Sequence, residues 1–140
     1  MDLLIRGYVD EEYASLNLER VEELLSQVES GVIQRPEVEL TDDDTGIDLH
    51  LGLVLTKNII AGWLITPVHH GEPFSHTICK IEGSREFIEG LIYCGAPENI
   101  IDTAILQKAE VLEVIDSFFK EGKHPQNYTS CPFEETFSGY

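Results

Sequence analysis

Residues 104–127 constrain the fold more than any other stretch, because apolar residues recur there at the three- and four-residue spacing of a helix. This spacing places five apolar side chains on one helix face: Val111, Leu112, Ile115, Phe118 and Phe119. The opposite face carries charged side chains: Glu110, Glu113, Asp116 and Lys120. Gly122 suits the left-handed position past a helix end, and Pro125 prevents the helix from resuming. We therefore predict an amphipathic helix, with a short extended segment before it at 103–106 and a strand after it near 126–130.

A second helix is predicted at 16–28. Its apolar stripe consists of Leu18, Val21, Leu24, Leu25 and Val28. Asn17 is a suitable N-cap, because its side-chain oxygen can accept a hydrogen bond from the first turn. Glutamates early in the helix favour the positive end of its dipole, and Ser30 and Gly31 end it.

The clearest strand is predicted at 47–55, where apolar and polar residues alternate. One face carries Ile47, Leu49, Leu51, Leu53 and Leu55, and the other carries Asp48, His50 and Gly52. After a turn at 56–58, residues 59–66 return as an apolar antiparallel strand that buries Trp63 in the core. Further strands are predicted at 37–40, 74–81 and 87–94, a strand or a frayed arm at 1–9, and a strand or an ordered arm at 131–140. Between them we expect a turn at 41–46, an irregular loop at 67–73 and a break at 95–97.

This order of elements predicts an α+β fold. We expect a mainly antiparallel sheet of about five or six strands, with the N-terminal and C-terminal helices packed on it. A chain of 140 residues is long enough for one core and one domain, 1–140.

The formal net charge of −17 is the unusual feature of the composition. Residues 1–48 hold 14 acids and 3 bases, a net charge of −11, against −6 for residues 49–140. Such a field repels phosphate backbones, so we expect no direct binding of nucleic acid. It accelerates docking of a basic partner, although acidity also serves solubility, and charge alone does not separate these two interpretations.

The sequence also bounds the compartment. No apolar run approaches the roughly 20 residues that cross a bilayer, and the start of the sequence lacks a basic region before an apolar stretch. We therefore expect a cytoplasmic protein that does not interact with membranes. Cys79, Cys94 and Cys131 form no Cys-x-x-Cys pair, which argues against a disulfide scaffold or a zinc knuckle.

Two segments contain possible metal ligands. Asp42, Asp43 and Asp44 are contiguous, whereas a calcium loop of the EF-hand type alternates its ligands and closes with a glutamate. His69, His70, Glu72 and His76 lie on a predicted loop without the spacing that aims ligands together. We expect a solvated turn and a polar loop with titrating imidazoles, and no metal or other cofactor.

Local motifs for catalysis are also missing from the sequence. It contains no phosphate-binding glycine loop, no Gly-x-Ser-x-Gly motif and no local arrangement of a nucleophile with histidine. Its acids cluster in predicted turns, whereas a general acid needs a desolvated site that raises its pKa. The sequence therefore predicts a protein that binds rather than an enzyme.

The C-terminal unit resembles the end of many bacterial immunity proteins of polymorphic toxin systems, and looks like their first family. The resemblance rests on Ile105 and Leu106, the helix with Phe118 and Phe119, and the exit at Pro125, within about residues 101–129. Where that family often has a tryptophan after the proline, this chain has Tyr128, Thr129 and Ser130, and the N-cap position is Gln107 rather than serine.

The resemblance implies an antitoxin that binds one toxin domain and blocks it, including toxins delivered by contact-dependent growth inhibition. We expect the partner to be a basic nuclease or nucleic-acid deaminase, and the free protein to be a monomer. The acids suggested for the interface, with the neighbouring histidines, are Asp42, Asp43, Asp44, Asp48, His69, His70 and Glu72, and a second candidate patch is Glu134 and Glu135. For each acid, a purely solvated surface charge is the competing interpretation.

Two other function classes stay open at this point. One is an acidic adaptor or scaffold domain that binds a basic cellular protein without inhibiting it. The other is a small hydrolase or metal-dependent enzyme that uses the histidine-containing loop.

Overall fold

A computed structural model describes residues 1–6, 10–31, 37–42, 46–56, 61–69, 72–92 and 96–139. The strands within these ranges are β1 (Asp2–Arg6), β2 (Glu11–Tyr13), β3 (Glu37–Asp42), β4 (Ile47–Thr56), β5 (Ala61–His69), β6 (His76–Lys80), β7 (Phe87–Ile92), β8 (Ala96–Ile101) and β9 (Tyr128–Pro132). The helices are α1 (Leu18–Glu29), α2 (Lys108–Glu121) and α3 (Phe133–Thr136), and a 3-10 turn, η1, spans Asp102–Ala104. In this part of the chain, no helix has the length and apolarity needed to cross a membrane.

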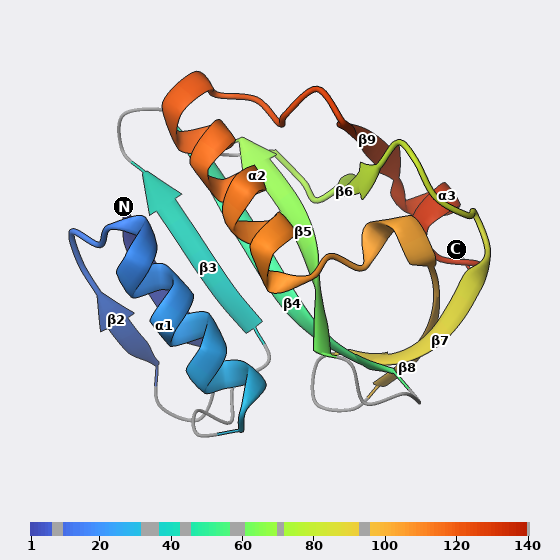
Figure 1. Ribbon diagram of the computed structural model, residues 1–140, viewed down its shortest axis with the longest axis horizontal. Helices are drawn as coiled ribbons and strands as arrows, with labels where there is room; N and C mark the ends of the chain where they lie inside the picture. Colours follow the sequence, from blue (N-terminus) through green and yellow to red (C-terminus); the bar gives the residue numbers. More distant parts are fainter. Residues whose placement is uncertain are drawn as a thin grey trace.

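The main sheet is antiparallel and is organised around β4 (Figure 1). Along one side of β4 runs β5, and the other side pairs first with β3 and then, at the last three residues, with β7. The strand order is β2-β1-β3-β4-β7-β8, with β5 beside β4, and β6 and β9 form a separate two-stranded sheet. The predicted α+β, mainly antiparallel fold is confirmed, and the main sheet has seven strands because β2 and β8 extend it.

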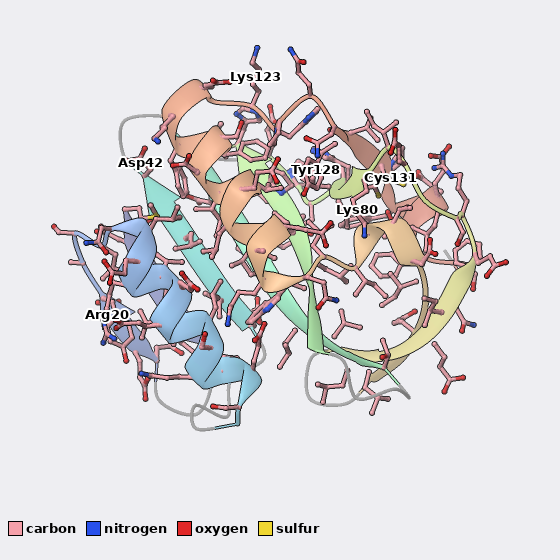
Figure 2. The ribbon with its side chains drawn as sticks, in the orientation of Figure 1. Arg20, Asp42, Lys80, Lys123, Tyr128 and Cys131 are labelled. Atoms are coloured by element: carbon pink, nitrogen blue, oxygen red, sulfur yellow. The ribbon has the colours of Figure 1, made fainter. Side chains whose placement is uncertain are left out.

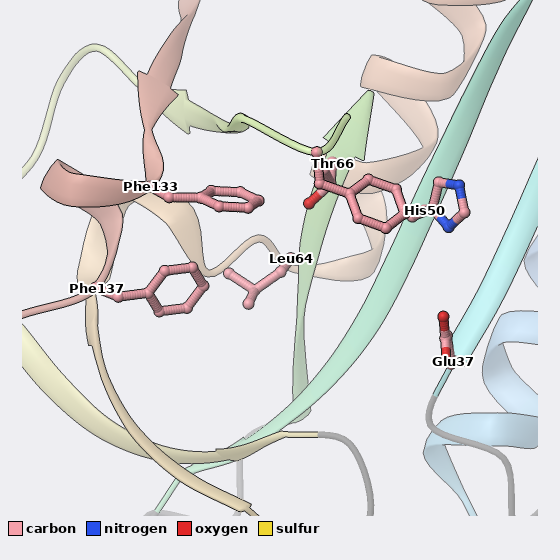
Figure 3. Close-up of a pocket in the computed structure, with 7 residues that line it drawn as sticks. Glu37, His50, Leu64, Thr66, Phe133 and Phe137 are labelled. Carbon is pink, nitrogen blue, oxygen red and sulfur yellow. The ribbon is translucent and has the colours of Figure 1, made fainter. Parts of the chain in front are cut away.

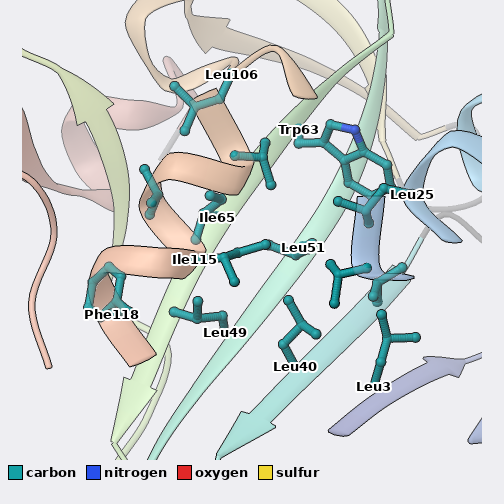
Figure 4. Close-up of a cluster of buried hydrophobic side chains, with 14 of the residues drawn as sticks. Leu3, Leu25, Leu40, Leu49, Leu51, Trp63, Ile65, Leu106, Ile115 and Phe118 are labelled. Carbon is teal, nitrogen blue, oxygen red and sulfur yellow. The ribbon is translucent and has the colours of Figure 1, made fainter. Parts of the chain in front are cut away.

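The two long helices cover one face of this sheet and form the main core with it (Figures 1 and 4). Alternation along β4 points Leu49 and Leu51 toward the helices, where they are fully buried. The helices supply Leu24 and Leu25 from α1, and Ile115 and Phe118 from α2, among others. The apolar residues that recur along the two predicted helices and those that alternate along β4 therefore pack against each other in one core.

The predicted N-cap of α1 and the predicted C-terminal end of α2 are both confirmed. The Asn17 side chain accepts a hydrogen bond of 2.9 Å from the Arg20 backbone N–H at the start of α1. Gly122, with φ 74°, ends α2 in the left-handed conformation, and its N–H donates to the Phe118 carbonyl. At the start of α2, the Glu110 carboxylate accepts from the Gln107 N–H at 2.9 Å, which satisfies a backbone donor there.

Two proline segments were predicted to interrupt strands, and both predictions are wrong at the proline itself. The loop predicted at 67–73 begins later, because β5 continues through Pro67 to His69. The backbone N–H and C=O of Trp63 both bond to Leu106, on the side of β5 that faces away from β4. Pro67 is an even number of residues further along the strand, so its backbone faces the same way, and β4 does not need the N–H that proline lacks. The break predicted at 95–97 is in part β8, an edge strand, where Pro97 is tolerated.

Three C-terminal details also differ from the predictions. The extended segment at 103–106 is the turn η1 followed by a single bridge from Leu106 to Trp63. The strand predicted at 74–81 is present as β6, but it pairs with β9 outside the main sheet. The tail forms α3 rather than a strand or arm, since Thr136 Oγ1 donates back to the carbonyls of Cys131 and Pro132.

Trp63 connects the main sheet to both long helices. Its side chain is fully buried, as predicted, and its indole N–H donates to Glu29 of α1 at 2.7 Å. Glu29 in turn lies 3.8 Å from the ammonium of Lys108, the first residue of α2. Gly62 allows residues 105 and 106 to approach β5, because a Cβ at that position would overlap Ile105 Cγ2.

A second, smaller core lies between β4, β5, β8 and the two-stranded sheet. Cys79 of β6 and Cys131 of β9 are buried free thiols in this cluster. Burial, together with the neighbouring Cys131, raises the pKa of the Cys79 thiol to about 12. Cys94 lies outside the described residues.

We predict that Cys79 resists alkylation in the folded protein near neutral pH, because the thiolate is the nucleophile and a pKa of about 12 leaves almost none of it. The measurement is iodoacetamide labelling followed by peptide mapping, with the denatured protein as the positive control. Labelling of the Cys79 peptide at the same rate in both states would contradict the assignment of a buried, protonated thiol.

Candidate partner-binding face

The face of the main sheet opposite α1 and α2 carries polar side chains that are partly buried or exposed. In Figure 1 the helices lie in front of the strands, so this face points away from the viewer. We call it the open acidic face and define it by Asp2, Leu4, Glu12, Glu37, Glu39, Thr41, Asp48 and His50. This face follows from the alternation of side chains along a strand: where one residue faces the helices, the residues before and after it face away from them.

The register of the strands arranges this face in cross-strand rows. One row runs Glu12, Leu4, Glu39, His50, and the next runs Asp2, Thr41, Asp48. Each row places a neutral residue between two acids, so repulsion between directly opposed carboxylates is avoided. Among the described side chains, this face carries five carboxylates: Asp2, Glu12, Glu37, Glu39 and Asp48.

A hollow of about 360 Å³ opens where this face meets the segments that cover the rest of the sheet (Figure 3). Its lining comes from five parts of the chain: Glu37 of β3, His50 of β4, Leu64 and Thr66 of β5, Phe74 ahead of β6, and Phe133 of α3 with Phe137 directly after it. Figure 3 shows Phe133 and Phe137 on one side of the hollow and Glu37 and His50 on the other. The hollow is therefore apolar at one end and polar at the other.

His50 is the central polar residue of this hollow. Its ring packs edge-on against Phe74, with the ring centroids 4.7 Å apart. Its Nδ1 atom is buried and has no hydrogen-bond partner among the described residues. Thr66, opposite His50 in the β4–β5 ladder, is only 8% exposed. A buried nitrogen without a partner is costly to the fold.

The acids suggested from the sequence are divided between two places. Asp48 lies on the open acidic face. Asp42 of β3 and His69 of β5 pair with Ile47 of β4 in one cross-strand row at the end of the sheet. This row lies on the helix-covered side of the sheet, and Figure 2 shows Asp42 at the end of β3. The Glu72 N–H donates to the His69 carbonyl at 2.9 Å, so Glu72 is at this same end. Asp43, Asp44 and His70 lie outside the described residues.

The second suggested patch borders the hollow. Glu134 and Glu135 are exposed on α3, between Phe133 and Phe137, which line the hollow. The Glu135 carboxylate is 3.9 Å from Arg85, and both side chains are well exposed, so this ion pair contributes little to stability. The patch is therefore beside the hollow and at a different site from Asp42 and Glu72.

Of the histidines in the suggested segment, His69 and His76 lie among the described residues. His76 contacts the Ser75 hydroxyl through Nδ1 at 3.1 Å. Burial lowers the pKa of His76, and the neighbouring imidazoles of His69 and His124 lower it further. Among the described residues, no three His, Cys, Asp or Glu side chains are arranged to hold a metal ion.

Sequence reasoning did not select Glu37, Glu39 or the aromatic lining of the hollow as site residues. A usable signal was present, because the polar positions of 37–41 and 48–50 alternate with apolar ones. Pairing these segments as antiparallel neighbours would have placed Glu39 beside His50. No comparable local pattern in the sequence predicts that Phe74, Phe133 and Phe137 line the same hollow.

Comparison with known proteins assigns no family to this chain: no protein-family model matches the sequence, and no curated protein matches it.

Proposed function

We propose that this chain is an immunity protein that neutralises a basic bacterial toxin domain by binding it stoichiometrically. The observation that supports the proposal best is the open acidic face with its hollow: five carboxylates lie on one side of the sheet, beside a hollow lined by Glu37, His50 and aromatic rings. The resemblance of residues 101–129 to immunity proteins supplies the class of partner.

Electrostatics favour such a pairing. A toxin that acts on nucleic acid must attract phosphates and therefore presents a positively charged cleft. A protein of net charge −17 is steered toward that cleft, and a face with five carboxylates complements it. Because the face lies on paired strands rather than on loops, little conformational entropy would be lost on binding.

The same proposal includes the compartment and the oligomeric state. A toxin that attacks nucleic acid acts inside the cell, so its inhibitor would act in the cytoplasm. We propose that the free protein is a monomer and that one copy binds one toxin domain.

The test is co-expression with the C-terminal domain encoded by the neighbouring reading frame. We expect that domain alone to stop growth, this protein to restore it, and the two to co-elute as a 1:1 complex by size-exclusion chromatography with light scattering. Growth arrest despite co-expression, or a harmless neighbour, would contradict the proposal. A stable complex that leaves the partner's activity intact would instead indicate the acidic adaptor.

A further inference from the structure

The hollow on the open acidic face has the chemistry to bind one specific kind of side chain. We propose that it receives an arginine side chain of the basic partner, with the guanidinium at Glu37 and His50 and the aliphatic part against the phenylalanines. This inference rests on the proposed function for the identity of the partner, but it concerns only the ligand chemistry of this one site.

The polar end of the hollow matches a guanidinium. The Glu37 carboxylate provides a charged acceptor, which forms stronger hydrogen bonds than a neutral one. A guanidinium has five N–H donors in a fixed plane, so two of them can pair with both oxygens of this carboxylate at once. His50 and Phe74 also line the hollow, and their rings offer a surface on which the flat guanidinium can stack.

The apolar end matches the rest of the side chain. Leu64, Phe133 and Phe137 form a wall that methylene groups can cover, as arginine side chains often do. Phe74 packs against His50, next to the position of the proposed guanidinium, where an aromatic ring also attracts a cation. About 360 Å³ is at the lower end of ligand-site volumes and suits one side chain rather than a large molecule.

Other occupants fit less well. An anion would meet Glu37 and the neighbouring Glu39 and Asp48 on the same face. A purely apolar side chain would take the Glu37 carboxylate out of water without pairing it. Lysine would supply charge, but its compact, strongly hydrated ammonium lacks the flat shape that stacks on aromatic rings.

The test uses the intact protein and three short peptides, acetyl-Gly-X-Gly-amide, in which X is arginine, citrulline or lysine. Citrulline keeps the shape of arginine without its charge. The readout is the NMR chemical shift of the His50 imidazole and of the phenylalanine rings during titration. We expect saturable shifts with the arginine peptide, a dissociation constant on the order of 1 mM, and at least about fivefold weaker binding of the other two peptides.

Two matched variants assign the binding to the hollow. Glu37→Gln is expected to weaken the arginine peptide by about tenfold, as expected for loss of a charge-assisted contact. Glu12→Gln removes the same charge from the same face, but Glu12 lies on β2, three strands away from His50 and outside the hollow, and it is expected to have less than about a twofold effect. Thermal unfolding of both variants checks that neither has lost the fold.

Three outcomes would overturn the inference: no shift at His50, equal binding of the arginine and citrulline peptides, or equal effects of the two variants. Because these measurements use no toxin, they separate the two proposals. Peptide binding without toxin neutralisation would support the arginine site and contradict the immunity function. Toxin neutralisation without peptide binding would support the function and contradict the arginine site.

Discussion

Replacing Trp63 by alanine is expected to lower the free energy of unfolding by about 3–5 kcal/mol, a large fraction of the stability of a domain of this size. The side chain is fully buried in the main core, so its removal leaves a cavity between β5 and the helices. It also removes the indole N–H from which the Glu29 carboxylate accepts a hydrogen bond of 2.7 Å. The effect therefore combines lost apolar burial with a lost hydrogen bond to a charged group.

Denaturant unfolding followed by circular dichroism measures this change without relying on the fluorescence of the only tryptophan. Leu55→Ala is the matched control, because Leu55 is a large apolar residue of the same sheet that is 45% exposed, and it is expected to cost less than about 1 kcal/mol. Glu29→Gln keeps an acceptor oxygen for the indole N–H but removes the charge, including the contact with Lys108, and is expected to cost about 1 kcal/mol. A Trp63→Ala cost no larger than that of Leu55→Ala would contradict the position of Trp63 in the core.

Neutralising the open acidic face is expected to slow association with the basic partner by about 10–100-fold at low salt. The variant is Glu37→Gln, Glu39→Gln and Asp48→Asn, which removes three charges from adjoining strands of the proposed interface. The reason is loss of steering, so the difference from the unmodified protein should shrink as salt screens both. Stopped-flow or surface-based kinetics across a salt series measures the association rate constant.

A control with the same change in net charge distinguishes a specific face from overall acidity. Glu19, Glu22 and Glu23 are exposed on α1, on the other side of the sheet, and their replacement by glutamine also removes three charges. We expect this control to change the association rate constant by less than about threefold. Equal slowing by both triple variants would contradict the open acidic face as the interface. Slowing by Asp42→Asn with Glu72→Gln alone would move the interface to the end of the sheet.

Some features of this protein follow from the sequence because they depend on near neighbours. The end of α2 is an example, since Gly122 and the apolar spacing before it act within one or two helical turns. The inward face of β4 is another, because alternation needs only residues two positions apart. The strong acidity is a property of composition and needs no structure at all.

Other features depend on which strands become neighbours, and local patterns do not report this. Pro67 lies inside β5 without disturbing the sheet because its missing N–H faces away from β4, a matter of register that composition cannot indicate. For the same reason Asp42 and Asp48, close together in the sequence, belong to opposite faces of the sheet.

The sequence by itself therefore determined the two long helices, the inward side of most of β4 and the sign of the protein's charge. Only the tertiary structure decided which face stays open and what lines it. The hollow joins Glu37 and His50 to Phe133 and Phe137, residues separated by more than half the chain. Such contacts form when the core between helices and sheet has fixed the path of the chain, because burial of the apolar side leaves the polar side of the same strands to face outward.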